Sequence, residues 1–229
     1  MDGILPIYKP VGITSFDVIR EFKRAQFTGP GPVKYKIGHG GTLDPFANGV
    51  LLLLLGKATK KMNELSELPK TYHATAVLGA RSDTLDRTGT IKEIPDVWDP
   101  LTPGILGEIT GKFVGEIEQE IPDYSATKIN GVPRYKLARE GEVMTKKSKV
   151  VTVHALTIDE IADAQVSFTA TVSSGTYIRQ LSYDIFKSLN IESYLETLTR
   201  TQIGDFSIEK CCQISDLKDQ NWLKYIRQL

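Results

Sequence analysis

Six consecutive apolar residues, one valine and five leucines, occupy positions 50–55 and form the most hydrophobic stretch of the chain. A continuous apolar run of this length is typical of one buried strand. Polar and apolar residues alternate most clearly at Val166, Phe168, Ala170 and Val172, which predicts another strand. The sequence predicts strands at 2–8, 50–55, 70–79, 113–121, 150–158 and 165–173, and either a strand or a loop and a strand at 194–203.

Helical spacing of apolar residues separates several of these strands. Thr14 and Asp17 have the spacing of a capping box, and the apolar stripe that follows predicts a helix to about residue 27. Further helices are predicted from about 58 to 65, from 102 to about 110, over 133–139, from about 176 to 189 and over the last dozen residues. Strands that occur singly and in adjacent runs favour an α/β (α+β) fold with a mixed or antiparallel sheet over a regular βαβ fold.

A glycine-rich stretch, residues 38–49, precedes the leucine run. Its four glycines permit positive φ angles and close approach of a ligand, and Pro45 biases Asp44 toward an extended conformation. The stretch is therefore predicted to be a shaped loop with the Asp44 carboxylate at its centre, where chemistry is plausible. The alternative is an ordinary turn in which Asp44 bonds its own backbone.

Composition narrows the class of protein. The 229 residues have an ordinary globular composition, no apolar run approaches the roughly 20 residues of a membrane helix, and the N-terminus does not resemble a signal peptide. The two cysteines are adjacent and the three histidines are scattered, which indicates neither a disulfide framework nor a metal site. We therefore expect a cytoplasmic protein without a metal.

The net charge is zero, but the charges are unevenly distributed. Residues 1–62 carry nine Lys and Arg against four Asp and Glu, and residues 128–149 carry seven against two. Residues 83–123 carry three against ten. The two basic segments could form a phosphate-binding surface, and an unevenly charged solvated surface is an equally good interpretation.

Motifs for nucleotide cofactors and hydrolases are missing: there is no Walker loop, Rossmann fingerprint or Gly-x-Ser-x-Gly elbow. Polar residues in predicted loops and at element ends remain as candidates. An arginine near Asp44 would favour the ionised carboxylate, and a tyrosine offers a stacking surface and a hydroxyl. Taken singly, each candidate could instead be a turn former, a core-edge aromatic or a surface residue. The candidates are His39, Asp44, Tyr72, Asp83, Asp86, Tyr177 and Arg179.

Together, the ordered motifs resemble the TruB family of tRNA pseudouridine synthases. The resemblance runs from residue 3 to about 206. The motifs are Lys-Pro-Val-Gly-Ile-Thr-Ser-Phe-Asp-Val from 9, Gly-His-Gly-Gly-Thr-Leu-Asp-Pro-Phe-Ala-Asn-Gly from 38, Lys-Thr-Tyr from 70, Ser-Asp-Thr-Leu-Asp-Arg-Thr-Gly from 82, Pro-Asp-Tyr-Ser-Ala-Thr-Lys-Ile-Asn-Gly from 122, Tyr-Lys-Leu-Ala-Arg-Glu-Gly from 135, Gly-Thr-Tyr-Ile-Arg from 175 and Leu-Thr-Arg-Thr-Gln-Ile-Gly from 198.

The resemblance implies a pseudouridine synthase fold, with a mixed, largely antiparallel sheet flanked by helices and an RNA-binding cleft. The implied substrate is the T-loop uridine of tRNA, position 55 in tRNA numbering, whose glycosidic bond is broken and re-formed through C5 after base flipping. Neither a metal nor an organic cofactor is implied. The implied catalytic residues are Asp44, Tyr72 and Arg179, with Arg179 pairing with Asp44. The expected substrate-binding residues are His39, Thr42, Tyr72, Asp86, Lys128, Tyr177 and Leu198.

The residues leave the chemical route open. Asp44 could attack C1′ of the ribose, it could attack C6 of the base, or Asp44 or Tyr72 could remove the 2′ proton to give a glycal. Two positions depart from the family pattern: Gly40 replaces a Thr or Ser, and Thr199 replaces an arginine. Either change could weaken an RNA contact.

Many bacterial relatives continue into a PUA RNA-binding domain. We expect a single catalytic domain over 1–229, a short helical tail over 207–229 and no PUA domain. The basic segments would then supply most of the phosphate contacts, and we expect a monomer. Two alternatives remain: a non-catalytic RNA-binding or tRNA-folding module, and an RNA-guided enzyme of the archaeal and eukaryotic type.

Overall fold

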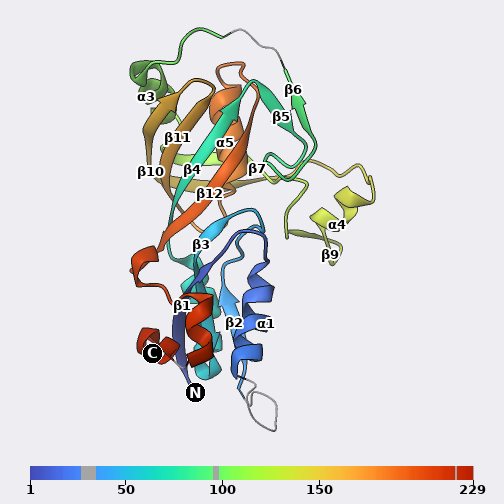
Figure 1. The fold of residues 1–229 in the computed structure, drawn as a ribbon. Helices are drawn as coiled ribbons and strands as arrows, with labels where there is room; N and C mark the ends of the chain where they lie inside the picture. Colours follow the sequence, from blue (N-terminus) through green and yellow to red (C-terminus); the bar gives the residue numbers. More distant parts are fainter. Residues whose placement is uncertain (27–34, 95–97, 220, 229) are drawn as a thin grey trace. The chain divides into compact units, whose positions relative to one another are not determined.

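The computed structural model describes residues 1–26, 35–94, 98–219 and 221–228 (Figure 1). The chain divides into two compact units. Unit 1 contains residues 1–72 and 198–229, and unit 2 contains residues 73–197. Strands β4 (Lys70–Leu78) and β12 (Ser193–Ile203) each have residues in both units. The predicted end of the first helix, at about residue 27, lies outside the described residues.

Unit 1 is built around strand β3, which is the predicted leucine strand. β3 pairs antiparallel with β1 and with β2, and parallel with β12 through Thr199 and Arg200. Besides parts of β4 and β12, the elements of unit 1 are β1 (Gly3–Lys9), α1 (Ser15–Gln26), β2 (Ile37–Gly40), β3 (Asn48–Leu55), the 3-10 helix η1 (Gly56–Lys61), α2 (Met62–Glu67), β13 (Phe206–Ser207) and the 3-10 turns η2 (Ile208–Lys210), η3 (Ile214–Asp219) and η4 (Asn221–Tyr225).

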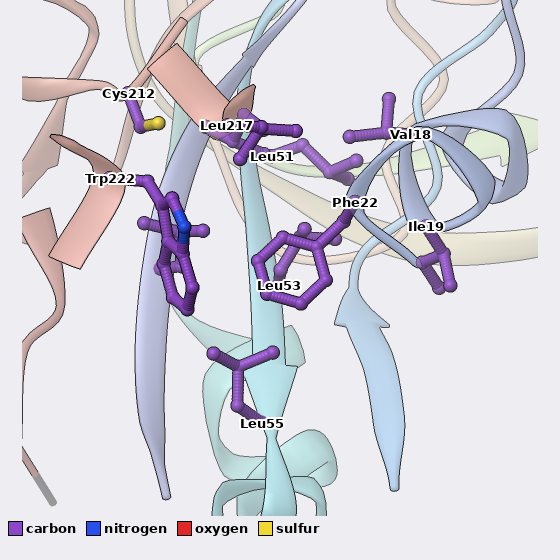
Figure 2. Close-up of a cluster of buried hydrophobic side chains, with 11 residues drawn as sticks. Val18, Ile19, Phe22, Leu51, Leu53, Leu55, Cys212, Leu217 and Trp222 are labelled. Atoms are coloured by element: carbon purple, nitrogen blue, oxygen red, sulfur yellow. The ribbon is translucent and has the colours of Figure 1, made fainter. Parts of the chain in front are cut away.

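The leucines of β3 contribute to two hydrophobic clusters, because successive side chains of a strand point to opposite faces. Leu51, Leu53 and Leu55 pack with residues of α1 and the C-terminal segment (Figure 2). In this cluster Phe22 and Trp222 meet edge to face, with ring centroids 4.9 Å apart. Leucines at positions 52 and 54 belong to the second cluster. The strand is therefore buried on both faces, as the unbroken apolar run predicted.

Unit 2 contains a sheet with strand order β4-β11-β10-β7. β10 pairs antiparallel with β11, with two register shifts, and antiparallel with β7. Helix α5 contacts β7, and α3 contacts β10. The elements of unit 2 are β5 (Ala80–Ser82), β6 (Ile91–Glu93), α3 (Pro103–Gly111), β7 (Gly115–Glu120), β8 (Lys128–Ile129), β9 (Val132–Pro133), α4 (Arg134–Arg139), β10 (Ser148–Ala162), β11 (Gln165–Val172) and α5 (Ile178–Lys187).

The predicted fold class is confirmed, because strands and helices intermix and most strand pairings are antiparallel. Two predicted helix starts are also confirmed in detail. Thr14 and Asp17 exchange side-chain and backbone hydrogen bonds in a capping box. The Thr102 side chain accepts a hydrogen bond from the Ile105 amide at 3.3 Å and caps α3.

Three short pairings were predicted as loops and are strands in the structure. The start of the glycine-rich stretch forms β2, and two small hairpins, β5-β6 and β8-β9, occupy parts of the predicted polar loops. The glycines and polar side chains of β2 have low strand propensity, so its sequence does not predict a strand. Its backbone nevertheless forms hydrogen bonds with the edge of β3 that β1 leaves open. Among the last dozen residues, which were predicted to be helical, 218–219 and 221–225 lie in 3-10 turns and not in an α-helix, and 226–228 are not helical.

Within the described part of the chain, no helix is long and apolar enough to cross a membrane.

Candidate active site

Asp44 lies in a loop between β2 and β3, residues 41–47, which we call the Asp44 loop. The hydroxyl oxygen of Ser15 accepts a hydrogen bond from the Leu43 amide at 2.9 Å, and its hydroxyl donates to the Leu43 carbonyl at 3.3 Å. The Gly12 amide donates to the carbonyl of Pro45 at 2.8 Å. The residues on both sides of Asp44 are thus tied to the start of α1, while the Asp44 side chain stays partly exposed.

Arg200 anchors the same loop from β12. Its Nε donates to the Val50 carbonyl at 2.8 Å, and its two terminal nitrogens donate to the carbonyls of Gly41 at 3.1 Å and Thr42 at 3.4 Å. The side chain is only 1% exposed. Because the three carbonyls flank Asp44 in the sequence, one guanidinium group holds both the start of the loop and the strand that follows it.

Gly49 shows why the motif contains glycine at this point. Its φ angle is 113°, and it pairs with Arg200 in the parallel register of β3 and β12. A Cβ atom at this position would clash with the Arg200 carbonyl oxygen. Glycine therefore permits the close backbone approach that brings Arg200 to the loop.

Tyr72, Leu198 and His39 are the other unit 1 residues for which we predict a role. The Tyr72 hydroxyl lies 3.5 Å from an Arg200 nitrogen, and the Arg200 guanidinium carbon lies 6.0 Å from the centre of its ring. Leu198 is buried on β12. His39 lies on β2, where burial and the Arg200 charge lower the pKa of its imidazole, which favours the neutral ring at pH 7. Its Nδ1 is buried without a hydrogen-bond partner among the described residues.

Two buried lysines add positive charge near the loop. The Lys9 ammonium donates to the carbonyls of Pro10 at 2.9 Å and Ile13 at 2.8 Å. Burial lowers the pKa of Lys9 to about 8, and the nearby Asp44 carboxylate opposes this shift. Lys70 donates to the Leu68 carbonyl at 2.6 Å, and burial together with the Arg200 charge lowers its pKa to about 8.

Arg179 lies in the first turn of α5 in unit 2 and is 4% exposed, which contradicts the alternative of a surface helix residue. Its terminal nitrogens donate to the carbonyls of Thr84 at 2.6 Å and Tyr124 at 2.9 Å. Its Nε lies 3.5 Å from Oδ2 of Asp86, and that carboxylate is itself buried. Oδ1 of Asp86 accepts hydrogen bonds from Thr88. Arg179 therefore links two loops, 82–89 and 122–131, to the start of α5.

Tyr177 precedes α5 and is held by Gln119 on β7. The Gln119 amide group accepts from the Tyr177 backbone N–H at 2.8 Å and donates to its carbonyl at 3.1 Å. The Tyr177 hydroxyl lies 2.8 Å from the hydroxyl of Thr127, and the Lys149 ammonium lies 4.3 Å from the ring centre. Lys128 is exposed on the neighbouring strand β8.

The predicted residues fall into two groups, one in each unit. In unit 1, Arg200 contacts both Tyr72 and Thr42, which lies two residues before Asp44, and the unit also holds His39 and Leu198. Unit 2 brings Arg179 and Asp86 together and holds Tyr177 and Lys128. The pairing of Arg179 with Asp44 joins residues of different units and stays a prediction.

Sequence reasoning did not single out three residues that support these groups: Arg200, Lys9 and Gln119. Arg200 and Lys9 lie within recognised motifs, and the position of Arg200 inside a possible strand was a usable signal of burial with a partner. Gln119 lies among glutamates in a polar strand, so no signal in the sequence distinguishes it. Among the described residues, no group of three or more His, Cys, Asp or Glu side chains could hold a metal ion.

Comparisons with known proteins agree with the motifs. Residues 31–178 match the family described as TruB family pseudouridylate synthase, N-terminal domain. A tRNA pseudouridine synthase B of Clostridium acetobutylicum is 41% identical over 221 residues, which cover 96% of this chain and 74% of that protein. The protein of the same name from Flavobacterium johnsoniae is 38% identical, and the match covers 93% of each chain.

Among solved structures, the chain is similar to one in the crystal structure of a Cbf5-Nop10-Gar1 complex. The TM-score is 0.74 and the sequence identity is 26%. The match covers 99% of this chain and 60% of the solved chain, so the present chain spans less than two thirds of that protein.

Proposed function

The chain belongs to the TruB family of pseudouridylate synthases and isomerises uridine in tRNA, and we propose that its target is the T-loop uridine at position 55. The observation that carries this proposal is the Asp44 loop, where a partly exposed carboxylate sits in a backbone fixed from two sides. A rigidly held acid group suits a reaction in which one bond of a positioned nucleotide must be broken and another formed.

A uridine inside a folded T-loop must leave the base stack before any enzyme group can reach it, at a cost of a few kcal/mol. We assign His39 to fill the gap or contact the extruded nucleotide, and its neutral ring suits contact with an uncharged base. Tyr72 would stack on the flipped base, while Leu198, Thr42 and Tyr177 would help to place the nucleotide.

Asp44 is proposed as the catalytic group in each of three routes: attack at C1′, attack at C6, or removal of the 2′ proton, in which Tyr72 could serve instead as the base. The Asp44 carboxylate interacts electrostatically with the buried Lys9 ammonium. We propose that Arg179 pairs with Asp44, and that Asp86 positions Arg179. The reaction as proposed needs neither a metal nor an organic cofactor.

Contact with the tRNA backbone is assigned to the basic segment 128–149 of unit 2. Lys128, Lys136, Lys146 and Lys147 are all exposed there, and exposed lysines supply salt-sensitive phosphate contacts. We propose that the protein binds the T-arm stem-loop as a monomer.

The proposed target is tested with the purified protein and a T-arm stem-loop transcript, without added guide RNA or partner protein. The expected result is pseudouridine at position 55 and none in a transcript with cytidine at that position. The similarity to a chain from a Cbf5 complex makes guide dependence the second candidate, although identity is higher to the tRNA enzymes, at 41% against 26%. Conversion that occurs only with an added guide RNA would overturn the proposal.

A further inference from the structure

We propose that Arg200 is a positioning residue for the reaction: its guanidinium group sets the place of the Asp44 carboxylate relative to the ring of Tyr72. This inference rests on the proposed function of the Asp44 loop. The contacts of Arg200 reach three separate segments of unit 1, namely the start of the loop, the strand that follows it and β4.

The shape of the guanidinium group is the first argument. Its planar fork offers five N–H donors, and here its three nitrogens point to the carbonyls of Gly41, Thr42 and Val50. A lysine ammonium is a compact point charge on a flexible stem and cannot span the same carbonyls in one plane. The loop ends are therefore held by the geometry of arginine and not only by its charge.

Burial is the second argument. Arg200 is 1% exposed, so its nitrogens cannot exchange these carbonyls for water. Buried carbonyls that lose their donor remain unsatisfied, which penalises alternative positions of the loop. The Asp44 loop is short, and a fixed start and end leave its central carboxylate little freedom.

The contact with Tyr72 is the third argument. The same nitrogen that binds the Thr42 carbonyl lies 3.5 Å from the Tyr72 hydroxyl, and the cation faces the ring at 6.0 Å. A shift of the guanidinium would therefore move the Asp44 loop and the tyrosine relative to each other. Arg200 also raises the local positive potential, which lowers the pKa of His39 and of Lys70.

The test compares wild type with Arg200→Lys, which keeps the charge and removes the fork. Single-turnover pseudouridine formation is measured with enzyme in saturating excess, so that tRNA affinity does not enter the rate. Because a displacement of about 1 Å in an active site can cost about 10²-fold in rate, we expect a loss of that order. The Kd for tRNA should change by less than about threefold, since phosphate contacts dominate affinity.

A matched control separates positioning from general stability. Trp222→Leu removes a ring from the core of unit 1 shown in Figure 2 and leaves every Arg200 contact in place. It should lower the Tm at least as much as Arg200→Lys and leave the single-turnover rate near that of wild type. Arg200→Ala leaves three carbonyls without their donor, so it serves only for rescue. In this variant guanidinium ion should restore the rate at low millimolar concentration without changing the Kd for tRNA.

Hydrogen exchange of the peptide that spans residues 38–49 gives a readout independent of activity. We expect faster exchange in Arg200→Lys than in Trp222→Leu. If wild type converts the uridine and Arg200→Lys matches it in rate and in exchange, the positioning role is wrong. If wild type itself converts no uridine but exchange rises as expected, the proposed function fails and the structural part of the inference stands.

Discussion

The side chain of Ser15 exchanges two hydrogen bonds with the backbone of Leu43, one residue before the proposed catalytic aspartate and 28 positions away in the sequence. Ser15 opens helix α1 and is buried. The first helix of the chain therefore supports the Asp44 loop directly. This relationship explains why the motif at residues 9–18 and the motif at residues 38–49 belong together.

Ser15→Ala should destabilise the protein and disturb the loop. It leaves the buried Leu43 amide without its acceptor, at a cost of ~1–3 kcal/mol in the free energy of unfolding. Urea unfolding measures this cost. Ser215→Ala removes an exposed hydroxyl and should change the free energy by less than about 0.5 kcal/mol. Equal effects of the two variants would contradict the support that Ser15 gives to the loop.

Gly49→Ala and Gly107→Ala should have opposite effects on stability. Gly49 has a φ of 113° and faces the Arg200 carbonyl, so alanine adds strain on the order of 1–3 kcal/mol or more. Gly107 lies inside α3 with nothing within 4 Å of an added Cβ, so alanine should stabilise by about 0.5–1 kcal/mol. Thermal unfolding measures the stability of both variants. A Gly49→Ala variant as stable as wild type would contradict the close approach of the Gly49 and Arg200 backbones.

The buried Lys9 should make stability depend on alkaline pH. Its pKa is lowered from 10.5 to about 8 in the folded protein, so between these values the unfolded chain binds a proton that the folded protein does not. The free energy of unfolding therefore rises with pH over this window because of Lys9. In Lys9→Met this rise should be smaller, with the contribution of Lys70 remaining. If the free energies of unfolding of wild type and Lys9→Met rise in parallel between pH 8 and 10, Lys9 is not desolvated in the folded protein.

Lys128→Ala should weaken tRNA binding through lost charge. One phosphate contact changes the slope of log K against log salt concentration by about 0.7–0.9, so the slope should become shallower by that amount. Lys92→Ala is the matched control, because Lys92 is also exposed but lies in the acidic segment 83–123. Filter binding over a range of salt concentrations measures both slopes. A steeper or unchanged slope for Lys128→Ala places the phosphate contacts elsewhere.

The amino-acid sequence predicted those helices and strands whose residue pattern is complete within one short segment. Three patterns that each lie within a dozen residues predicted their elements: the leucine run of β3, the alternation of β11 and the capping box of α1. Strand β2 was not predicted, because its strand character comes from the edge of β3 that it completes. The two small hairpins were missed because their strands have only two or three residues, too few to show an alternating pattern.

The candidate residues of the site were predicted from motifs, but their supports were not. Burial of Arg200 and Arg179 depends on carbonyls contributed by segments far away in the sequence, for example Val50 and Tyr124. The residues next to an arginine in the sequence do not indicate which distant carbonyl lacks a hydrogen-bond donor. The side chains that hold a site are therefore harder to predict than those that act in it.

The proposed role of Asp44 is tested most directly by mapping pseudouridine in unmodified tRNA transcript after incubation with wild type and with Asp44→Asn. The substitution keeps the size of the side chain and removes the carboxylate. We expect conversion of the T-loop uridine by wild type alone, while both proteins bind tRNA with similar affinity. Conversion by both proteins would contradict the assignment of Asp44 as the catalytic group.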